Sequence, residues 1–257
     1  MKEVADGNKR GRKMSKEKKQ QTEEVQEGGA AENVKDGTNS AEEVQEGTPE
    51  ETRQLTKAEQ RRLEGFQKLT EELEGKGYVK KNLTTTAALA NTLGLVYGAA
   101  LGFLFAIPYF VFGCNKTTEQ DAPLWGILTM VLFIVFIVVH ELIHGITWSL
   151  GMKGGFKNVE FGFIVQYMTP YCTCKVPMSK TRYILGSMMP CITLGILPCI
   201  ASYFTGNAFL LAIGVMMIFA AGGDLLVTQM ILTHKYEGKD RLFVDHPTEI
   251  GLALFEK

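Results

Sequence analysis

The stretch VLFIVFIVVHELIHGITW, residues 131–148, places two histidines and a glutamate directly after nine consecutive apolar residues. Together with its apolar flanks, such a run predicts a helix long enough to cross a membrane. Ionisable side chains are costly in that environment, and those that occur there usually have a function. His140, Glu141 and His144 are therefore the first candidate functional residues of the chain.

Apolar segments of this kind recur along the 257-residue chain. Residues 82–115 and 183–223 contain no Asp, Glu, Lys or Arg, and each run exceeds the roughly 20 residues that cross a bilayer core. Gly206 and Asn207 form a turn that divides the second run. We therefore expect an all-α membrane protein with four transmembrane helices, at about residues 86–112, 123–150, 183–204 and 207–233. The formal net charge of −1 gives no indication of a nucleic-acid partner.

Two further regions precede the predicted spans. Residues 1–54 are charged, poor in apolar side chains and repetitive, with TEEVQEG (22–28), AENVKDG (31–37) and AEEVQEG (41–47), and they predict a disordered tail. Residues 55–78 begin with Thr56 and Glu59 at the spacing of a capping box, followed by apolar residues at helical spacing. They predict an amphipathic helix that either lies on the membrane or packs on the rest of the protein.

A different pattern lies between the second and third predicted spans. The segment VEFGFIVQYMTPYCTCKV, residues 159–176, is rich in β-branched and aromatic side chains and predicts a small membrane-associated β-hairpin. A strand edge near the bilayer needs a partner, so Phe163 and Val165 are candidate substrate-binding positions where a peptide would add as a strand. Cys172 and Cys174 leave a soft-metal pair open, although we expect all five cysteines to be free thiols.

The histidines of the opening stretch suit a metal site. His140 and His144 are one helical turn apart, so both imidazoles can bind one zinc ion, and the Glu141 carboxylate can take a proton from a water molecule that zinc activates. A catalytic zinc site needs a third protein donor. Asp224 is the one charged residue of the fourth span, and its depth from the cytoplasmic end, ~12 Å, matches the ~9 and ~15 Å of the histidines. Alternative donors outside the spans are Glu160, Asp240, Asp245 and His246.

Five motifs occur in a characteristic order within about residues 79–251: HELIHG (140–145), YCTCKVP (171–177), MMP (188–190), AAGGDLL (220–226) and VDHPTEIG (244–251). This order resembles a family of bacterial membrane proteins called putative zincin peptidases. That family is similar in plan to site-2-type intramembrane metalloproteases, which hold zinc by two histidines of one helix and an aspartate of a later one. The resemblance implies zinc ligands at His140, His144 and Asp224 and the catalytic acid at Glu141. Site-2 enzymes precede the aspartate with Asn-x-x-Pro, whereas Gly222 and Gly223 precede it here.

The residues by themselves predict metal-assisted hydrolysis, and the resemblance implies a zinc-dependent peptidase of the bacterial cytoplasmic membrane. We expect a metalloprotease-like transmembrane domain at residues 79–234, a cytoplasmic C-terminal segment at 235–257, and membrane proteins or peptides as substrates within the lipid bilayer. A non-catalytic zinc-binding scaffold or sensor is the alternative, and it would not need Glu141. A metal transporter would show more ionisable residues along its spans. The motif DHPT, residues 245–248, has three alternative interpretations: a helix start, a cytoplasmic clamp, or no catalytic role.

Basic residues predict the orientation of the spans. They flank the first span at Lys80 and Lys81, follow the fourth, and crowd residues 151–182, so both termini are expected in the cytoplasm. In a variant with its native cysteines replaced by alanine, an impermeant thiol reagent should label a cysteine at Thr118 in intact cells and spare one at Lys157. Labelling at Lys157 would contradict this orientation.

Overall fold

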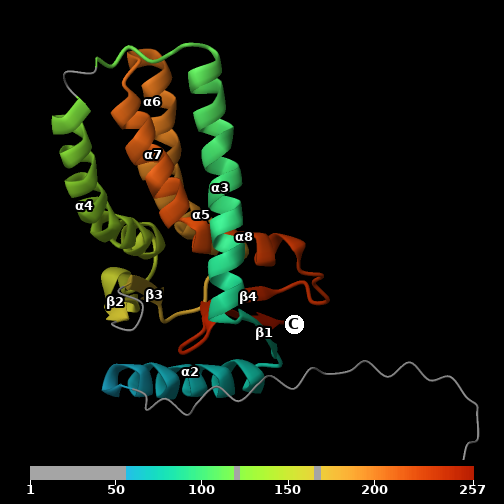
Figure 1. Cartoon of the computed structure of the whole chain (residues 1–257). Coiled ribbons are helices and arrows are strands. Elements are labelled where there is room, and N and C mark those ends of the chain that lie inside the picture. The colour runs from blue at the N-terminus through green and yellow to red at the C-terminus, as the bar shows by residue number, and fades with distance from the viewer. Residues whose placement is uncertain (1–55, 119–121, 165–168) are drawn as a thin grey trace, which may run out of the picture. The chain divides into compact units, whose positions relative to one another are not determined.

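Apolar helices make up most of the computed structural model, which describes residues 56–118, 122–164 and 169–257 (Figure 1). The tail predicted at residues 1–54 lies outside these ranges, and the described residues belong to one compact unit. The first two long helices are α3 (Ala87–Val111) and α4 (Ala122–Ser149). A third, continuous helical segment consists of α5 (Lys180–Pro190), the π-helical stretch η4 (Cys191–Ile196) and α6 (Leu197–Thr205). It is followed by α7 (Ala208–Ala220) and α8 (Gly222–Thr233).

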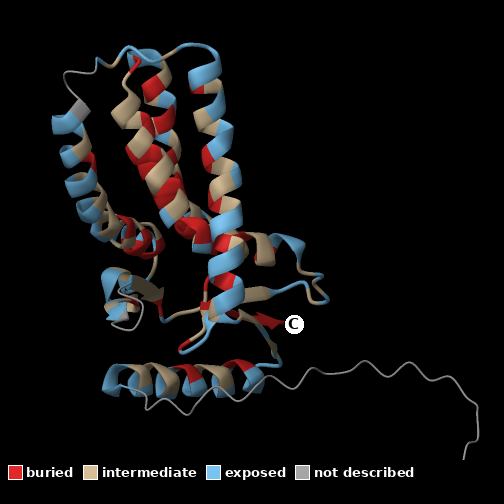
Figure 2. Cartoon of the chain, viewed as in Figure 1, coloured by how far each residue is buried: buried red, intermediate tan, exposed pale blue. Residues whose placement is uncertain are grey.

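Three of these helical segments are long and apolar enough to cross a membrane, namely residues 87–111, 123–149 and 180–205. The count rises to four if α7 and α8, which are bent by 52° at Ala221, form one span. Large apolar side chains are exposed along α3 and α4, and Figure 2 colours many residues of both helices as exposed. Such surfaces suit contact with lipid rather than water. The four predicted spans therefore correspond to helices, although the fourth is broken.

Close contact between α3 and the bent pair accounts for a glycine stripe on α3. Gly94 lies against the backbone of Gly222, and Gly98 lies against the backbone of Phe219. Gly102 packs below the Phe219 ring. Small residues let two helix backbones approach closely, and here the stripe serves packing within the chain.

A three-stranded antiparallel sheet is the main feature that the sequence interpretation missed. Its strands are β1 (Val79–Thr85), β5 (Ile250–Glu256) and β4 (Arg241–Asp245), in the spatial order β1-β5-β4. Side chains of a strand alternate between its two faces. Leu252 and Leu254 therefore join Trp148 and Tyr183 in a core beneath the helices, while Ala253 and Phe255 face the other way.

The amphipathic helix α2 (Lys57–Gly75) covers this second face of the sheet. Its N-terminus has the capping box predicted at Thr56 and Glu59. Phe66 and Leu73 are buried against Val244, Ala253 and Phe255. Packing on the protein, one of the two alternatives for this helix, is thus what the structure shows.

The predicted hairpin is present as β2 (Val159–Ile164) paired antiparallel with β3 (Thr169–Cys174), preceded by the short 3₁₀ turn η2 (Gly155–Asn158). Its association with a membrane stays a prediction. The helix start considered for DHPT at residues 245–248 is wrong, because these residues lead from β4 toward β5. The all-α prediction also needs correction, because the segment at 235–257 contributes two short strands: β5 pairs with β1, far away in the sequence, and β4 pairs with β5.

The contact between Gly94 and Gly222 generates a matched pair of substitutions. A Cβ at Gly222 would lie 2.7 Å from the Gly94 carbonyl carbon, whereas a Cβ at Gly223 meets nothing within 4 Å. We expect Gly222→Ala to destabilise the protein by about 1–3 kcal/mol, the usual cost of overpacking, and Gly223→Ala to be tolerated. Thermal unfolding of both variants in detergent checks this, and equal melting temperatures would contradict it.

Candidate metal centre

Two helices bring together the three candidate metal ligands. His140 and His144 occupy successive turns of α4, and Asp224 lies in the first turn of α8, immediately after the bend. The His140 Nε2 atom is 3.0 Å from Asp224 Oδ2, and the His144 Nε2 atom is 3.3 Å from Asp224 Oδ1. The two Nε2 atoms are 3.1 Å apart. Both histidines are buried, and together with Asp224 they form the one group of three or more potential ligands found among the described residues.

These separations fit a zinc ion. Tetrahedral zinc with bonds of about 2.0–2.1 Å places neighbouring ligand atoms about 3.3 Å apart, close to the three distances observed. The hydrogen-bond inventory agrees with this fit. If both imidazoles are neutral, the proton of His144 is on Nδ1 and is donated to the Gly186 carbonyl. At most one proton, that of His140, is then available for the three contacts among the two Nε2 atoms and the Asp224 carboxylate. A cation shared by the three side chains would compensate their lone pairs.

The ring of His144 is oriented by α5. Its Nδ1 atom is 2.9 Å from the Gly186 carbonyl oxygen, so Nδ1 carries the proton and Nε2 is left as the donor to a metal. Trp148 stacks on the His144 ring, with centroids 5.1 Å apart and an interplanar angle of 18°. A Cβ at Gly186 would overlap the Trp148 ring, so this close approach requires glycine.

Glu141 lies outside the group of three ligands and faces the hairpin. The Glu141 carboxylate interacts with the backbone N–H of Cys172 in β3. The hairpin reaches α4 because Gly145 has no side chain, and the Phe161 ring occupies the space where a Cβ would be. The hairpin thus borders the same helical turn that carries the histidines and Glu141.

The alternative third ligands predicted from the sequence have other partners. Glu160 forms ion pairs with Arg62 and Lys175, at 3.7 Å each. Asp240 accepts a hydrogen bond from Tyr78, and His246 lies 4.0 Å from Glu249. Neither Cys172 nor Cys174 belongs to a group of potential metal ligands in the described part of the chain, and all five cysteines are free.

Asp245 has a supporting role that the sequence interpretation did not assign. Its carboxylate accepts hydrogen bonds from the Cys174 N–H at 2.7 Å and the Thr173 hydroxyl at 3.1 Å, both in β3, and from the Tyr183 hydroxyl of α5. Burial raises the pKa of the Asp245 carboxyl, and the hydrogen bonds that it accepts oppose that shift. The end of β4 is therefore tied to the hairpin and to α5. In the sequence, the one feature that indicated a role for Asp245 was its place in the motif DHPT.

The two predicted substrate-binding positions are only partly described. Phe163 is exposed on β2, opposite Pro170 of β3. Val165 lies outside the described residues. The geometry of the hairpin leaves Phe163 accessible, and binding of a peptide there stays a prediction.

Comparison with known proteins gives one match. Residues 133–237 match the model of a family described as "Putative zincin peptidase". This segment includes both histidines, Glu141, the hairpin and Asp224. No curated protein and no solved structure matches the chain.

The donor set can be tested by removing one carboxylate at a time. We expect the purified protein to hold about one zinc ion per chain, Asp224→Ala to lose most of it, and Glu141→Gln to keep it, because Glu141 lies outside the group of three ligands. Metal analysis by mass spectrometry of the detergent-purified variants measures this. Full zinc content in Asp224→Ala would remove Asp224 from the donor set.

Proposed function

We propose, from the match of residues 133–237 to the putative zincin peptidase family, that this chain is a zinc-dependent peptidase acting within or beside a membrane. Its substrates would be peptide bonds of membrane proteins or of segments close to the membrane. Convergence of His140, His144 and Asp224 on one point, with Glu141 on the adjoining turn, is the observation that carries the proposal.

The proposed chemistry divides into binding and proton transfer. His140, His144 and Asp224 would hold the zinc, and the Gly186 carbonyl keeps His144 in the tautomer that binds metal. Zinc, when bound, acidifies a water molecule to a pKa of roughly 7 and polarises a carbonyl group. Glu141 would accept the proton of the attacking water and deliver it to the leaving amine nitrogen. Its place beside the ligands, rather than among them, leaves its carboxylate available for this transfer.

The hairpin supplies a route for binding a substrate in extended form. A helix within a membrane must replace its internal hydrogen bonds before its peptide bonds become accessible, and pairing with a strand edge provides such replacements. The β2–β3 hairpin packs on α4 beside Glu141, so a segment paired with it would pass close to the zinc ligands. Phe163, exposed on β2, belongs to the proposed binding strand.

A zinc-binding scaffold or sensor is the second candidate function. It shares the three ligands but makes no use of a partly buried carboxylate beside them. The placement of Glu141 next to β3 therefore favours the peptidase. We further propose that the helices lie in the bacterial cytoplasmic membrane with both termini in the cytoplasm, because the basic flanks gather on one side.

Cleavage itself is the test of this function. The purified protein and its Glu141→Gln variant are reconstituted with solubilised bacterial membrane proteins, and new peptide termini are identified by mass spectrometry. We expect the wild type to create new termini within or next to apolar segments, and Glu141→Gln to lower their number by at least about 100-fold, the loss typical for removal of a general base. Equal patterns of termini for the two proteins would refute a peptidase that depends on Glu141.

The same assay examines the hairpin. Phe163→Pro removes a backbone N–H from β2, so cleavage should fall while the zinc content stays near that of the wild type. The matched control is Phe163→Ala, which keeps the N–H. If cleavage is unchanged in Phe163→Pro, and also in a Val165→Pro variant, strand pairing is wrong.

A further inference from the structure

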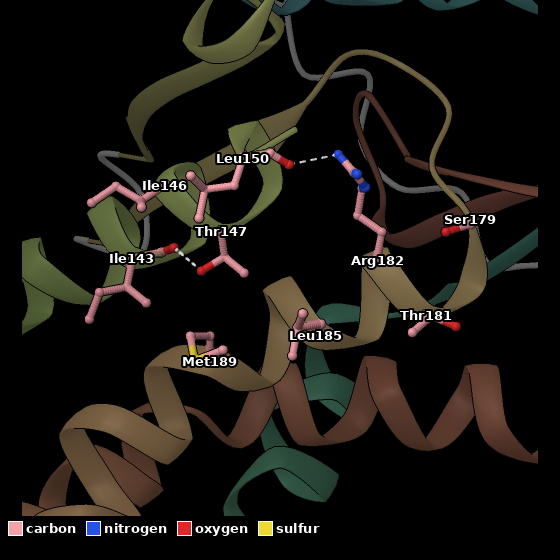
Figure 3. Close-up of a pocket in the computed structure, with 9 residues that line it drawn as sticks. All are labelled: Ile143, Ile146, Thr147, Leu150, Ser179, Thr181, Arg182, Leu185 and Met189. Atoms are coloured by element: carbon pink, nitrogen blue, oxygen red, sulfur yellow. Dashed lines mark hydrogen bonds between the residues drawn. The ribbon is translucent and has the colours of Figure 1, made fainter. Parts of the chain in front are cut away.

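A cavity lies between α4 and α5 (Figure 3). Its volume is about 620 Å³, within the 300–1,000 Å³ usual for sites that bind small molecules. We call it the α4–α5 groove; its lining is Ile143, Ile146, Thr147 and Leu150 of α4, and Ser179, Thr181, Arg182, Leu185 and Met189 at the start of α5 and along it. Leu150 and Leu185 are exposed, so the groove opens to the surroundings of the helices.

One end of the groove is polar and positively charged. The Arg182 Nη1 atom donates a hydrogen bond of 2.9 Å to the Leu150 carbonyl oxygen, as Figure 3 shows. Among the described residues this is the one hydrogen bond found for the Arg182 side chain, which has five N–H donors. Ser179 is the N-cap of α5, and its hydroxyl makes no cap bond. The N-terminus of α5, the Ser179 hydroxyl and the Arg182 guanidinium thus all line this groove, and each of them can stabilise an anion.

The other end of the groove is apolar. From Arg182 the wall continues through Leu185 to Met189, a rise of about 10 Å along α5, and Ile143 faces them from α4. The groove therefore changes from charged to apolar along its length. An amphipathic molecule with an anionic head and an aliphatic tail matches this order.

The groove and Glu141 are on opposite flanks of α4. At about 100° per residue, Ile143 and Leu150 lie about 160–180° around the helix axis from Glu141. A ligand in the groove consequently cannot reach the Glu141 carboxylate. A substrate peptide must place its scissile bond near Glu141, so this side of α4 suits a ligand that is not cleaved.

The polar end of the groove lies where the apolar helices end, and this position indicates the class of ligand. α4 ends at Ser149 and α5 begins at Lys180, so the apolar helices give way at this point to residues 151–182, which carry five Lys or Arg against one acidic residue, Glu160. Glu160 is already paired with Arg62 and Lys175. Basic residues at the edge of apolar helices attract anionic lipids. We propose that the α4–α5 groove binds one anionic phospholipid, with its phosphate at Ser179 and Arg182 and an acyl chain along Leu185, Met189 and Ile143.

A bound lipid would stabilise the packing of α4 against α5 next to the metal centre. The groove joins α4 to α5 directly behind the contact between His144 and Gly186, because Thr147 and Leu185 are neighbours of these residues on the same helices. The inference requires that the helices contact lipid but does not require peptidase activity. Lipid affinity and zinc content are separate measurements, so the failure of one proposal leaves the other distinguishable.

Native mass spectrometry of the zinc-loaded full chain in detergent tests the proposal. Phosphatidylglycerol or phosphatidylethanolamine with identical acyl chains is titrated into the wild type, Arg182→Gln and Lys157→Gln. Lys157→Gln is the matched control, since it removes one positive charge from the same segment at an exposed position outside the groove. We expect one preferred phosphatidylglycerol per chain, an affinity about fivefold lower in Arg182→Gln, and little change in Lys157→Gln.

Two further variants keep the test decisive. Arg182→Lys retains the charge but loses the planar fork, so it should fall between the wild type and Arg182→Gln. Leu185→Trp fills the apolar half and should weaken phosphatidylglycerol binding while zinc content stays unchanged. If Arg182→Gln fails to fold, Leu185→Trp alone decides the outcome, and wild-type affinity in it overturns the proposal.

Three further results would also overturn the inference. Unchanged phosphatidylglycerol affinity in a folded Arg182→Gln variant removes the phosphate site. If Arg182→Gln and Lys157→Gln lower the phosphatidylglycerol affinity equally, the effect comes from the overall charge of residues 151–182 and not from the groove. Capture of a protein segment, in place of phospholipid, by a photo-crosslinking residue at Leu185 in native membranes assigns the groove to a peptide.

Discussion

Three electron-rich side chains meet inside a bundle of apolar helices, and that contact constrains the structure around it. The Nε2 atoms of His140 and His144 and the carboxylate of Asp224 are separated by 3.0–3.3 Å. Such a group is unfavourable in apolar surroundings unless a cation neutralises it, and zinc has the size and ligand preference to do so. Around it, Gly222 lets α8 begin against α3, and Gly186 lets α5 approach Trp148 and bind His144.

The helix α4 separates two environments around this centre. Its Glu141 flank carries the hairpin, which packs on Gly145 and presents the Cys172 N–H to the carboxylate. Its opposite flank, with Ile143 and Leu150, forms the groove with α5. The proposed substrate chemistry and the proposed lipid contact therefore lie on different sides of one helix, so residues of one side can be substituted without altering those of the other.

The sheet below the helices connects the hairpin to the rest of the protein. A two-stranded hairpin alone is only marginally stable. Here the Asp245 carboxylate at the end of β4 binds Cys174 and Thr173 of β3 together with Tyr183 of α5. The sheet is itself held between α2 and the core that contains Trp148, so the position of β3 relative to α4 depends on contacts from both ends of the chain.

The sequence alone determined the apolar helices, the capped helix α2, the hairpin and the candidate ligands, because each depends on local spacing or on unbroken apolar runs. His140 and His144 are neighbours by helical geometry, and Asp224 was singled out as the lone charge of an apolar segment. The sheet β1-β5-β4 escaped prediction because its pairing joins residues 79–85 to 250–256, and strand pairing leaves little trace in local spacing. Tertiary structure alone decided that Asp224 faces both imidazoles, that Gly186 orients His144, that Asp245 holds the hairpin, and that a groove opens behind α4. Each of these depends on how separate helices and strands approach one another, which the order of residues along one element does not specify.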